Sequence, residues 1–371
     1  MTRVAYIVSF VTKSVAFEWI VESIDRKRFE IVFILLNPED SSLERHLREH
    51  KVRTHRVHYA GKKDILRSTL EVHRLLRKER IDIVHAHLFE GSLIGLAAAK
   101  LAGITRRIHT RHNATIHHNY HPHAVKYDRM INHMSTDIVA ISESVRSILV
   151  DLEQVNPDKI TLIYHGFKLA EFNNIPETRV EALRSKYLSD APSGPVIGVI
   201  SRYIHWKGVQ YIVPAFEQVL SAHPGAKLVL ANASGPYSAD IKAMLKKLPI
   251  KSYVEIPFEA DIFALYQLFD LFVHTPIDPN SEAFGQIYVE ALAAGVPSIV
   301  TISGIAKEFI SNGKNALTVP FQNSDAIRYA LLRLLDDQQL QKTLSGNGKT
   351  SVAEMFTLER MVASLESMYA K

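Results

Sequence analysis

Residues 282–297 read EAFGQIYVEALAAGVP, and this stretch decides the fold more than any other part of the chain. Glu282 and Glu290 stand eight residues apart, and Phe284-Gly285 follows the first glutamate closely. The small, alanine-rich pattern that continues to Gly295 is typical of a helix. Free backbone N–H groups at the start of such a helix favour an anion, and a glycine there lets the chain pass close to a ligand. The stretch therefore predicts a loop with one carboxylate, followed by a helix that carries a second.

A second motif lies upstream, directly after the predicted strand Val196–Ile200. The sequence SRYIHWKG places Arg202 and Lys207 five residues apart, with Gly208 after the lysine. Arginine binds phosphate through two parallel hydrogen bonds, whereas lysine acts as a compact point charge. Both stabilise the negative charge that develops on a leaving phosphate. This strand end is therefore a candidate diphosphate site.

Together, the two motifs resemble the signature of family 4 retaining glycosyltransferases, closely over residues 196–320 and loosely in the first half. The resemblance implies that Arg202 and Lys207 bind the donor diphosphate. It implies further that Glu282 binds the transferred sugar and Glu290 the ribose of the nucleotide. Main-chain contacts to the donor are expected from Ile256, Ala283, Phe284, Gly285 and Gln286, with Ile256 next to the base.

Short segments rich in Val and Ile alternate with helix-like segments along the whole chain, which predicts α/β domains built on parallel sheets. In the first half, strands are expected at Val4–Ser9, Ile31–Leu36, Ile81–His85, Arg107–Thr110, Asp137–Ile141 and Ile160–Tyr164. In the second half, they are expected at Val196–Ile200, Lys227–Ala231, Tyr253–Ile256, Leu271–His274, Ser298–Thr301 and Ala316–Val319. Turn-rich residues 166–195 separate the two series.

The predicted architecture is two Rossmann-like doubly wound domains that face each other across a cleft, which is the GT-B architecture that the resemblance implies. The acceptor-side domain covers residues 1–170 together with a terminal helix near 356–371, and the donor domain covers residues 171–355. Ligands of such sheets bind at the carboxyl ends of the strands. We therefore expect both substrates at these edges.

Histidines gather in the first half, where seven of the eighteen lie between residues 109 and 133. The resemblance places His112 against the donor sugar, and His109 is the alternative if the strand register shifts by three residues. His117 and His118 belong to a loop that either lies over the acceptor or is an ordinary polar loop.

His85 and His87 form an H-x-H pair at another strand end, and side chains two residues apart in a strand point to the same face. Imidazole pairs suit zinc, but no third ligand stands at a helical spacing nearby. We therefore expect these rings to pack and hydrogen-bond at the cleft wall on the acceptor side. The sequence predicts no metal ligands and no cofactor, because the nucleotide-sugar is a substrate.

Two loops depart from the family pattern. The loop after the first strand reads SFVTKSVAF and lacks the paired glycines of many members, so the side chains of Lys13 and Ser14 are candidates for the acceptor-side contacts. Residues 303–308 read SGIAKE, where the family commonly has Gly-Gly-x-Pro-Glu.

Composition and charge indicate the cellular compartment and the kinds of surface that the protein could contact. The chain of 371 residues has 47% hydrophobic and 22% charged residues, no cysteine, and no apolar run long enough for a membrane span, so we expect a cytoplasmic protein. Residues 41–80 hold 12 basic and 5 acidic residues. This span is either a solvated surface or a docking surface for anionic lipid head groups at the cytoplasmic face of a membrane. Its only aromatic residue is Tyr59, which argues against nucleic-acid binding.

The sequence thus predicts a retaining, metal-independent hexosyltransferase that moves a sugar from a UDP- or GDP-linked donor to a sugar or lipid-linked acceptor. Assembly of surface polysaccharide or glycolipid is the expected role. A nucleotide-sugar 2-epimerase of the same fold and a catalytically silent binding or scaffold protein remain as alternatives.

Overall fold

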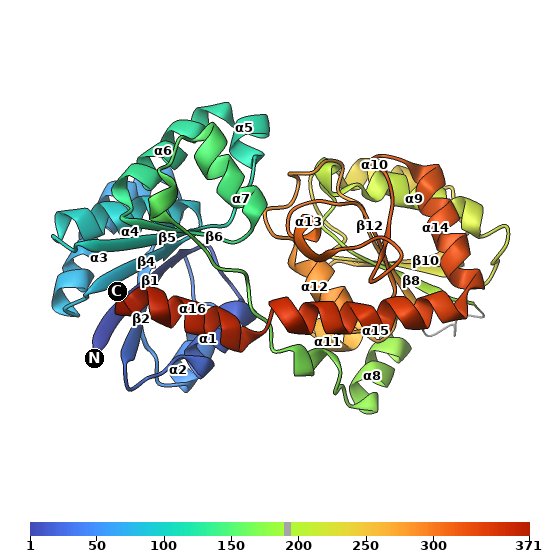
Figure 1. Ribbon diagram of the computed structural model, residues 1–371, viewed down its shortest axis with the longest axis horizontal. Helices are drawn as coiled ribbons and strands as arrows, with labels where there is room; N and C mark the ends of the chain where they lie inside the picture. Colours follow the sequence, from blue (N-terminus) through green and yellow to red (C-terminus); the bar gives the residue numbers. More distant parts are fainter. Residues whose placement is uncertain (189–193) are drawn as a thin grey trace. The chain divides into compact units, whose positions relative to one another are not determined.

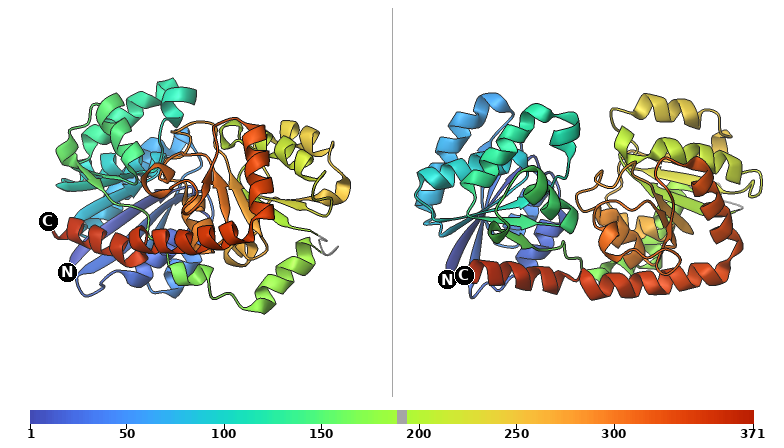
Figure 2. Two further views of the ribbon diagram at one scale, coloured as in Figure 1. Left: turned by 45° about the vertical axis from the view of Figure 1, so that its right-hand side comes forward. Right: turned by 45° about the horizontal axis from the view of Figure 1, so that its top comes forward.

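Two parallel β-sheets organise the computed structural model, which describes residues 1–188 and 194–371. The chain divides into unit 1, made of Met1–Phe167 and Leu358–Lys371, and unit 2, made of Lys168–Thr357. In each unit, helices cover both faces of the sheet (Figures 1 and 2). The two parallel-sheet α/β units confirm the predicted fold class.

The sheet of unit 1 has seven parallel strands in the order β3-β2-β1-β4-β5-β6-β7. The strands are β1 (Thr2–Ser9), β2 (Phe29–Asn37), β3 (Arg53–His58), β4 (Ile83–His87), β5 (Arg106–Arg111), β6 (Asp137–Ala140) and β7 (Ile160–Leu162). The α-helices are α1 (Val15–Ser23), α2 (Ser42–Glu49), α3 (Ile65–Lys78), α4 (Phe89–Leu101), α5 (Ile116–Tyr120), α6 (Val125–Met134), α7 (Glu143–Ser147) and α16 (Leu358–Ala370).

The central strands of unit 1 are buried on both faces. Every residue of β4 is buried, as are most residues of β1 and β2, because helices cover both sides of the sheet. Several helices begin at a residue whose side chain caps them. The Oγ atom of Ser142 accepts a hydrogen bond from the Val145 N–H at 3.2 Å and caps α7.

The last helix, α16, belongs to unit 1 although the segment before it belongs to unit 2. Its Tyr369 hydroxyl lies 2.5 Å from the Tyr6 hydroxyl of β1 and 2.6 Å from Nδ1 of His85 in β4. The guanidinium of Arg106 donates hydrogen bonds to the carbonyls of Met368 and Tyr369. These buried polar contacts hold the end of the chain against the sheet of unit 1 (Figure 1).

The sheet of unit 2 has six parallel strands in the order β10-β9-β8-β11-β12-β13. They are β8 (Val196–Ile200), β9 (Lys227–Ala231), β10 (Tyr253–Ile256), β11 (Leu271–His274), β12 (Ser298–Val300) and β13 (Leu317–Thr318). The α-helices are α8 (Glu177–Tyr187), α9 (Val209–Val219), α10 (Ser238–Leu245), α11 (Ile262–Tyr266), α12 (Gln286–Ala293), α13 (Ala306–Phe309), α14 (Ser324–Asp336) and α15 (Gln338–Met355). In this doubly wound order, the switch point lies between β8 and β11.

Two parts of unit 1 differ from the sequence prediction. The basic span, residues 41–80, contains α2, the edge strand β3 and α3. We did not predict β3, because its sequence RTHRVH is mostly polar and buries only Val57 fully. Strand β4 begins at Ile83 and not at the predicted Ile81, because the N–H of Ile81 still bonds to the Leu76 carbonyl of α3. Among the described residues, no helix is long and apolar enough to cross a membrane.

Candidate active site

A buried cluster of charged and polar side chains lies at the switch point of unit 2, where β8 and β11 end. Nζ of Lys207, in the loop after β8, donates a 2.6 Å hydrogen bond to Oε1 of Glu282. Nε2 of His274, the last residue of β11, lies 3.0 Å from the same oxygen. A carboxylate only accepts hydrogen bonds, so the imidazole must donate its Nε2–H. One carboxylate is therefore fixed by two donors from two neighbouring strand ends.

This arrangement keeps Glu282 ionised. Burial alone would raise its pKa, because the side chain is only 9% exposed. The charge of Lys207 and the hydrogen bond from His274 outweigh that effect and lower the pKa to about 2. The pKa of His274 is itself lowered, mainly by burial, so this ring is a neutral donor. The site thus holds a permanent carboxylate that can accept hydrogen bonds from sugar hydroxyls.

Residues 303–308, SGIAKE, hold the loop that carries Glu282 through hydrogen bonds. Oγ of Ser303 accepts a hydrogen bond from the Glu282 N–H at 3.1 Å, and the N–H of Ile305 donates to the Phe284 carbonyl at 2.9 Å. The N–H of Gly304 bonds to the carbonyl of Pro279. The departure from the family pattern at residues 303–308 therefore still provides a turn that clamps the Glu282 loop.

Two glycines of the site have backbone conformations that other residues adopt only at a cost. Gly208 has φ +76°, and a Cβ atom at this position would lie 1.7 Å from the Thr275 carbonyl oxygen. Gly285 has φ +84°, and its Cβ would lie 2.7 Å from the ring of Tyr288. Both conformations lie in the left-handed region that glycine enters readily. The glycines allow the loops after β8 and before α12 to pack tightly against the carboxyl edge.

The remaining cations and N–H groups are accessible. Arg202 follows β8 by two residues and is exposed, whereas Lys207 is partly buried by its contact with Glu282. Helix α12 begins at Gln286; the N–H of Tyr288 already donates to the Gly285 carbonyl, and the N–H groups of Gln286 and Ile287 have no acceptor within the helix. Phe284 is buried against Phe356, the residue that follows α15, so only its main chain can contact a ligand.

Glu290 lies in the second turn of α12 and behaves differently from Glu282. Its Oε2 accepts a 3.0 Å hydrogen bond from the Tyr266 hydroxyl. Among the described residues, no charged group contributes to the shift of its pKa. Burial therefore dominates and raises its pKa to about 7, although the hydrogen bond lowers it in part. The two glutamates, eight residues apart in sequence, thus have pKa values on opposite sides of the ordinary value.

The other predicted donor contacts are main-chain atoms. The carbonyl of Ile256, at the end of β10, accepts a hydrogen bond from the Ala233 N–H at 3.1 Å. Ala283 lies between Glu282 and Phe284 in the clamped loop and is partly exposed. Their contacts with a donor remain predictions.

In unit 1, several histidine rings cluster at the carboxyl ends of β4 and β5. Nδ1 of His87 lies 3.2 Å from Nε2 of His112, and the ring of His112 stacks on His165 with 5.7 Å between centroids. Burial, assisted by the neighbouring imidazoles, lowers the pKa of His112 to about 3. The pKa of His165 falls to about 4, again through burial. These rings are therefore neutral hydrogen-bonding groups at physiological pH.

His85 does not belong to the accessible part of this cluster, which corrects our placement of it on the acceptor side. Both of its ring nitrogens are used, Nδ1 by Tyr369 and Nε2 by Oγ1 of Thr110 at 2.7 Å, and its side chain is fully buried. Ser14 has a structural task as well, because its Oγ accepts from the Phe17 N–H and caps α1. Lys13 is exposed in the same loop.

The loop with His117 and His118 is anchored by buried charges. Arg111 contacts Asp128 at 2.8 Å and Glu153 at 2.5 Å, and all three side chains are at most 2% exposed. His117 bonds to Asp128 at 2.6 Å, and His118 lies 3.2 Å from Glu153. This network fixes the loop in place, so the loop is an ordered wall and not a freely moving segment.

A cavity of about 330 Å³ lies beside this wall, within unit 1. Ser9, Glu90, His109, His112 and His117 are among the residues that line it. Its size is at the lower end of the range for small-molecule sites. Most of its polar lining comes from the carboxyl ends of β1, β4 and β5.

Sequence reasoning missed three partners of the predicted residues. His274 and Tyr266 contact the two glutamates, and His165 stacks on His112. His274 ends a predicted strand next to the switch point, and that position could have indicated its role. Tyr266 and His165 carry no comparable pattern.

Solved structures show the same fold. HepE from Anabaena, in a crystal structure with UDP and glucose, superposes with a TM-score of 0.84 over the whole of both chains at 18% identity. Sucrose-phosphate synthase from Thermosynechococcus elongatus gives 0.78 at 17% identity, over 100% of this chain and 98% of that chain. The site described above thus lies in a fold of the GT-B glycosyltransferase class.

Sequence comparison shows which glycosyltransferase family the chain belongs to. The family described as Glycosyltransferase Family 4 matches residues 20–171, and Glycosyl transferases group 1 matches residues 184–351. The chain belongs to the family 4 glycosyltransferases. It is 27% identical over 312 residues to the capsular polysaccharide biosynthesis glycosyltransferase CapM of Staphylococcus aureus, over 82% of this chain and 80% of CapM. It is 24% identical to the alpha-monoglucosyldiacylglycerol synthase of Acholeplasma laidlawii, over 80% of this chain and 77% of the relative.

Proposed function

We propose that this protein transfers a hexose from a nucleoside diphosphate sugar to an acceptor hydroxyl with retention of anomeric configuration. The observation that carries the proposal is the pairing of Lys207 with Glu282 at the switch point of unit 2. It combines a phosphate-binding cation and an ionised sugar-binding carboxylate at one strand edge. Such a pair suits a substrate that joins a diphosphate to a sugar.

Each group has a distinct task in this reaction. Arg202, Lys207 and the first turn of α12 stabilise the negative charge on the departing diphosphate. Glu282 accepts hydrogen bonds from the sugar hydroxyls, and Glu290 from the ribose. His112, as a neutral imidazole, holds a further sugar hydroxyl.

The bond changes balance without a protein base. The acceptor oxygen forms a bond to the anomeric carbon on the face from which the diphosphate leaves. The bond between that carbon and the phosphate oxygen breaks, and the acceptor proton passes to the departing phosphate. No metal ion enters this scheme, because the two cations and the helix terminus supply the positive charge.

UDP is the first nucleotide to test. HepE was crystallised with UDP, and a relative from Escherichia coli, 22% identical over 312 residues, is a UDP-Gal-dependent galactosyltransferase. We would titrate the purified protein with UDP, GDP, ADP and dTDP in a calorimeter, without added metal. Selective binding of one nucleotide is expected, with a loss of about 100-fold or more in an Arg202→Ala variant.

Arg333→Ala provides the matched control, because Arg333 is also an exposed arginine of unit 2 but lies on α14. Its affinity should equal that of the wild type. No binding of any of the four nucleotides would refute the donor site, and a catalytically silent protein would then be the better description.

Retention is tested on the product. With an α-linked donor, proton NMR of the product should show an α-linkage. A β-linked product would contradict the proposed same-face attack. Conversion of the donor without any acceptor would instead favour the 2-epimerase alternative, for which membership of a glycosyltransferase family gives no support.

The acceptor belongs to the cavity of unit 1, on this proposal. Its volume of about 330 Å³ suits a single sugar ring or a similar head group, and His117 with Glu90 offers both donors and acceptors to hydroxyls. CapM acts in capsular polysaccharide biosynthesis, and the Acholeplasma relative makes a glucosylated diacylglycerol. A sugar or lipid-linked acceptor in polysaccharide or glycolipid assembly is consistent with both relatives.

A lipid-linked acceptor requires the protein to contact a membrane surface, and the exposed side chains of α3 suit such a contact. Leu66 and Leu70 stand one turn apart and are 73% and 43% exposed. Lys62 and Lys63 are exposed just before the helix. Apolar side chains flanked by basic ones are typical of helices that lie on anionic bilayers. We therefore assign α3 as a peripheral contact with the cytoplasmic face of a membrane.

Flotation with vesicles tests this contact. Binding to vesicles with phosphatidylglycerol at low salt is expected, and the Lys62→Ser/Lys63→Ser variant should bind roughly 30-fold more weakly, since each basic residue near the surface contributes about 1 kcal/mol. Arg45→Ser is the control, because Arg45 lies 3.7 Å from Asp40 and is already paired. Equal binding of both variants would exclude α3 as the contact.

A further inference from the structure

A second cluster of ligand-type side chains lies in unit 1, between helices α1 and α2. Nε2 of His46 lies 3.2 Å from Oε1 of Glu22, and Nε2 of His50 lies 3.8 Å from the same oxygen. The two imidazole rings stack with 4.0 Å between their centroids. All three ligand atoms fall within 4.8 Å of one another.

We propose that Glu22, His46 and His50 form a binding site for a divalent transition metal ion, with Zn²⁺ as the natural occupant. The sequence did not predict this site, because its ligands come from two helices separated by a strand. The inference is independent of the proposed transfer reaction.

The distances from the two imidazoles to the Glu22 oxygen are close to those that a bound ion requires. A tetrahedral Zn²⁺ with ligand bonds of about 2.0–2.1 Å places its ligand atoms about 3.3–3.4 Å apart. The two distances to the Glu22 oxygen lie on either side of that value. His46 lies on α2 and His50 directly follows its last residue, four positions later, and the two rings stack on the same side of the helix end.

The tautomer of His50 is already the one that a metal requires. Nδ1 of His50 lies 2.9 Å from the His46 carbonyl oxygen, which can only accept, so Nδ1 carries the proton. Nε2 therefore presents its lone pair towards Glu22. Metal-binding histidines are commonly oriented by such a bond from their other nitrogen. Nε2 of His46 is buried, and its 3.2 Å contact with Glu22 does not have hydrogen-bond geometry.

A salt bridge alone would not need this pairing of rings. A cation bound between them instead uses both lone pairs and the carboxylate. Two nitrogens and one oxygen suit Zn²⁺ or Cu²⁺ better than the oxygen-seeking Mg²⁺ or Ca²⁺.

The ends of the two helices are held together by Arg26. Its Nη2 donates to the Val21 carbonyl of α1 at 2.9 Å, and its Nη1 donates to the His50 carbonyl that follows α2 at 3.2 Å. The backbone that carries the ligands is thus fixed before an ion binds. The exposed fractions of 22% for His46 and 40% for His50 leave room for entry and for a water ligand.

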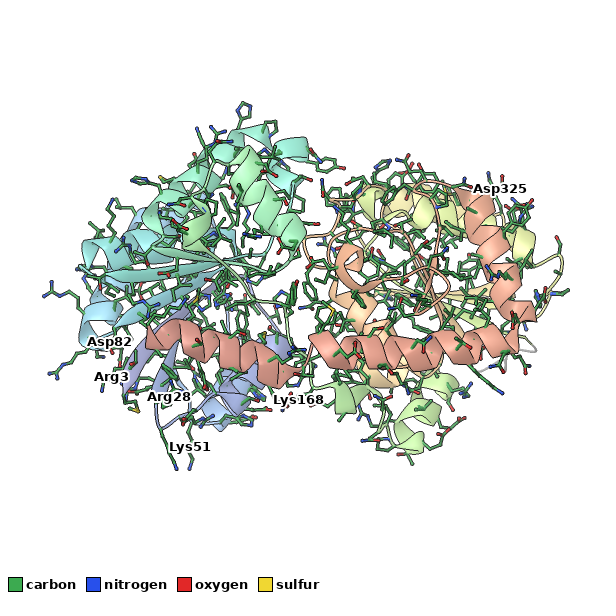
Figure 3. The ribbon with its side chains drawn as sticks, in the orientation of Figure 1. Arg3, Arg28, Lys51, Asp82, Lys168 and Asp325 are labelled. Carbon is green, nitrogen blue, oxygen red and sulfur yellow. The ribbon has the colours of Figure 1, made fainter. Side chains whose placement is uncertain are left out.

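The position of the cluster indicates a structural role. Helices that connect parallel strands run opposite to them, so the ends of α1 and α2 lie at the amino edge of the sheet, where Lys51 and Arg28 are labelled in Figure 3. The histidine cluster and the cavity of unit 1 lie at the carboxyl edge. A metal ion here would tie α1 to α2 and would take no part in transfer.

Calorimetric titration of the full chain with ZnCl₂, and of Co²⁺ followed by its visible absorption, tests the site. One Zn²⁺ per chain is expected, together with the absorption of tetrahedral Co²⁺ and a higher melting temperature with Zn²⁺. His50→Gln should lower the affinity by about 100-fold or more, because even orienting partners of ligands contribute 10–100-fold. His46→Gln should do the same.

Two controls separate this site from other histidines. His133→Gln removes an exposed histidine of α6 and should leave Zn²⁺ binding unchanged. His121→Gln tests the histidine-rich loop near α5, where Zn²⁺ could also bind. Absence of Zn²⁺ binding in the wild type, or binding that survives in His46→Gln and is lost in His121→Gln, would overturn the proposal. Neither result would affect the nucleotide titration of the donor site.

Discussion

The two glutamates of unit 2 should respond to neutralisation in opposite directions. At pH 8, Glu290→Gln is expected to stabilise unit 2, and Glu282→Gln to destabilise it. The pKa of Glu290 is raised from 4.5 to about 7, chiefly by burial. The pKa of Glu282 is lowered to about 2, because Lys207 and His274 outweigh the effect of its burial. Each difference from the ordinary value corresponds to about 3 kcal/mol, since one pKa unit is worth 1.36 kcal/mol.

The signs follow from proton binding. Between pH 4.5 and 7, the folded protein holds a proton on Glu290 that the unfolded chain has lost, so stability falls as the pH rises through this range. The cost is fully present above pH 7 and absent below pH 4.5. Glu282 contributes stability above pH 4.5 that is lost as the pH falls towards 2. Its contribution is therefore constant between about pH 5.5 and 8.

Urea unfolding at several pH values measures both effects. In a Trp19→Phe background, the fluorescence of Trp206 reports on unit 2 alone, since the chain has two tryptophans. Gln at position 290 keeps an oxygen that accepts from Tyr266, so packing is preserved. Glu290→Gln should raise the free energy of unfolding by up to about 3 kcal/mol at pH 8 and by almost nothing at pH 4.5.

Glu282→Gln is the matched comparison, because it should lower the free energy of unfolding by a similar amount at every pH from 5.5 to 8. If Glu290→Gln were less stable than the wild type at pH 8, or if its effect did not change with pH, the assignment of a raised pKa through burial would be wrong. The stabilised variant should nevertheless bind nucleotide more weakly, because it lacks the carboxylate for the ribose.

Three further results are expected. Gly208→Ala should abolish nucleotide binding and lower the melting temperature of unit 2, because the added Cβ would meet the Thr275 carbonyl. Gly313→Ala is the control: Gly313 also has a positive φ, +72°, but its Cβ would enter open space, so the free energy of unfolding should fall by only about 1–2 kcal/mol. Arg111→Met should cost about 3–5 kcal/mol in denaturant unfolding, because it removes the buried cation that contacts both Asp128 and Glu153. The exposed pair of Arg146 with Glu143 should contribute at most about 1 kcal/mol, as measured in Arg146→Met. Transfer assayed with and without EDTA should proceed at the same rate; a loss of activity that Mg²⁺ or Zn²⁺ restores would contradict metal-independent transfer.

Much of the fold follows from local sequence. Strands β8 to β11 begin and end where the sequence predicted them, because short runs of Val, Ile and Leu between turn residues are typical of strands buried on both faces. Strand β3 was missed, because an edge strand needs few apolar residues and its sequence is mostly basic. For β4, the predicted start was two residues early, because the end of α3 extends its hydrogen bonding to Ile81.

In the candidate site, too, some residues could be predicted from the sequence and others could not. The types and spacing of Arg202, Lys207, Glu282 and Glu290 were readable because each lies in a short motif beside a strand end or a helix start. Their partners were not readable, since His274 and Tyr266 reach the glutamates only after separate strands and helices come together. His85 was expected to pack and hydrogen-bond at the cleft wall on the acceptor side; it does pack and hydrogen-bond, but the helix from the end of the chain buries it completely.

The sequence by itself determined the alternation of strands and helices, the class of enzyme and the charged residues that suit a nucleotide-sugar, because these depend on neighbours within a few positions. Only the tertiary structure decided how those residues are protonated. The opposite pKa values of Glu282 and Glu290 arise from burial and from Lys207, which is 75 residues away from Glu282 in the chain. The cluster of Glu22, His46 and His50 has the same origin, because folding alone places the ends of α1 and α2 side by side. Electrostatic interactions act through space, and the order of residues alone does not fix the distances on which they depend.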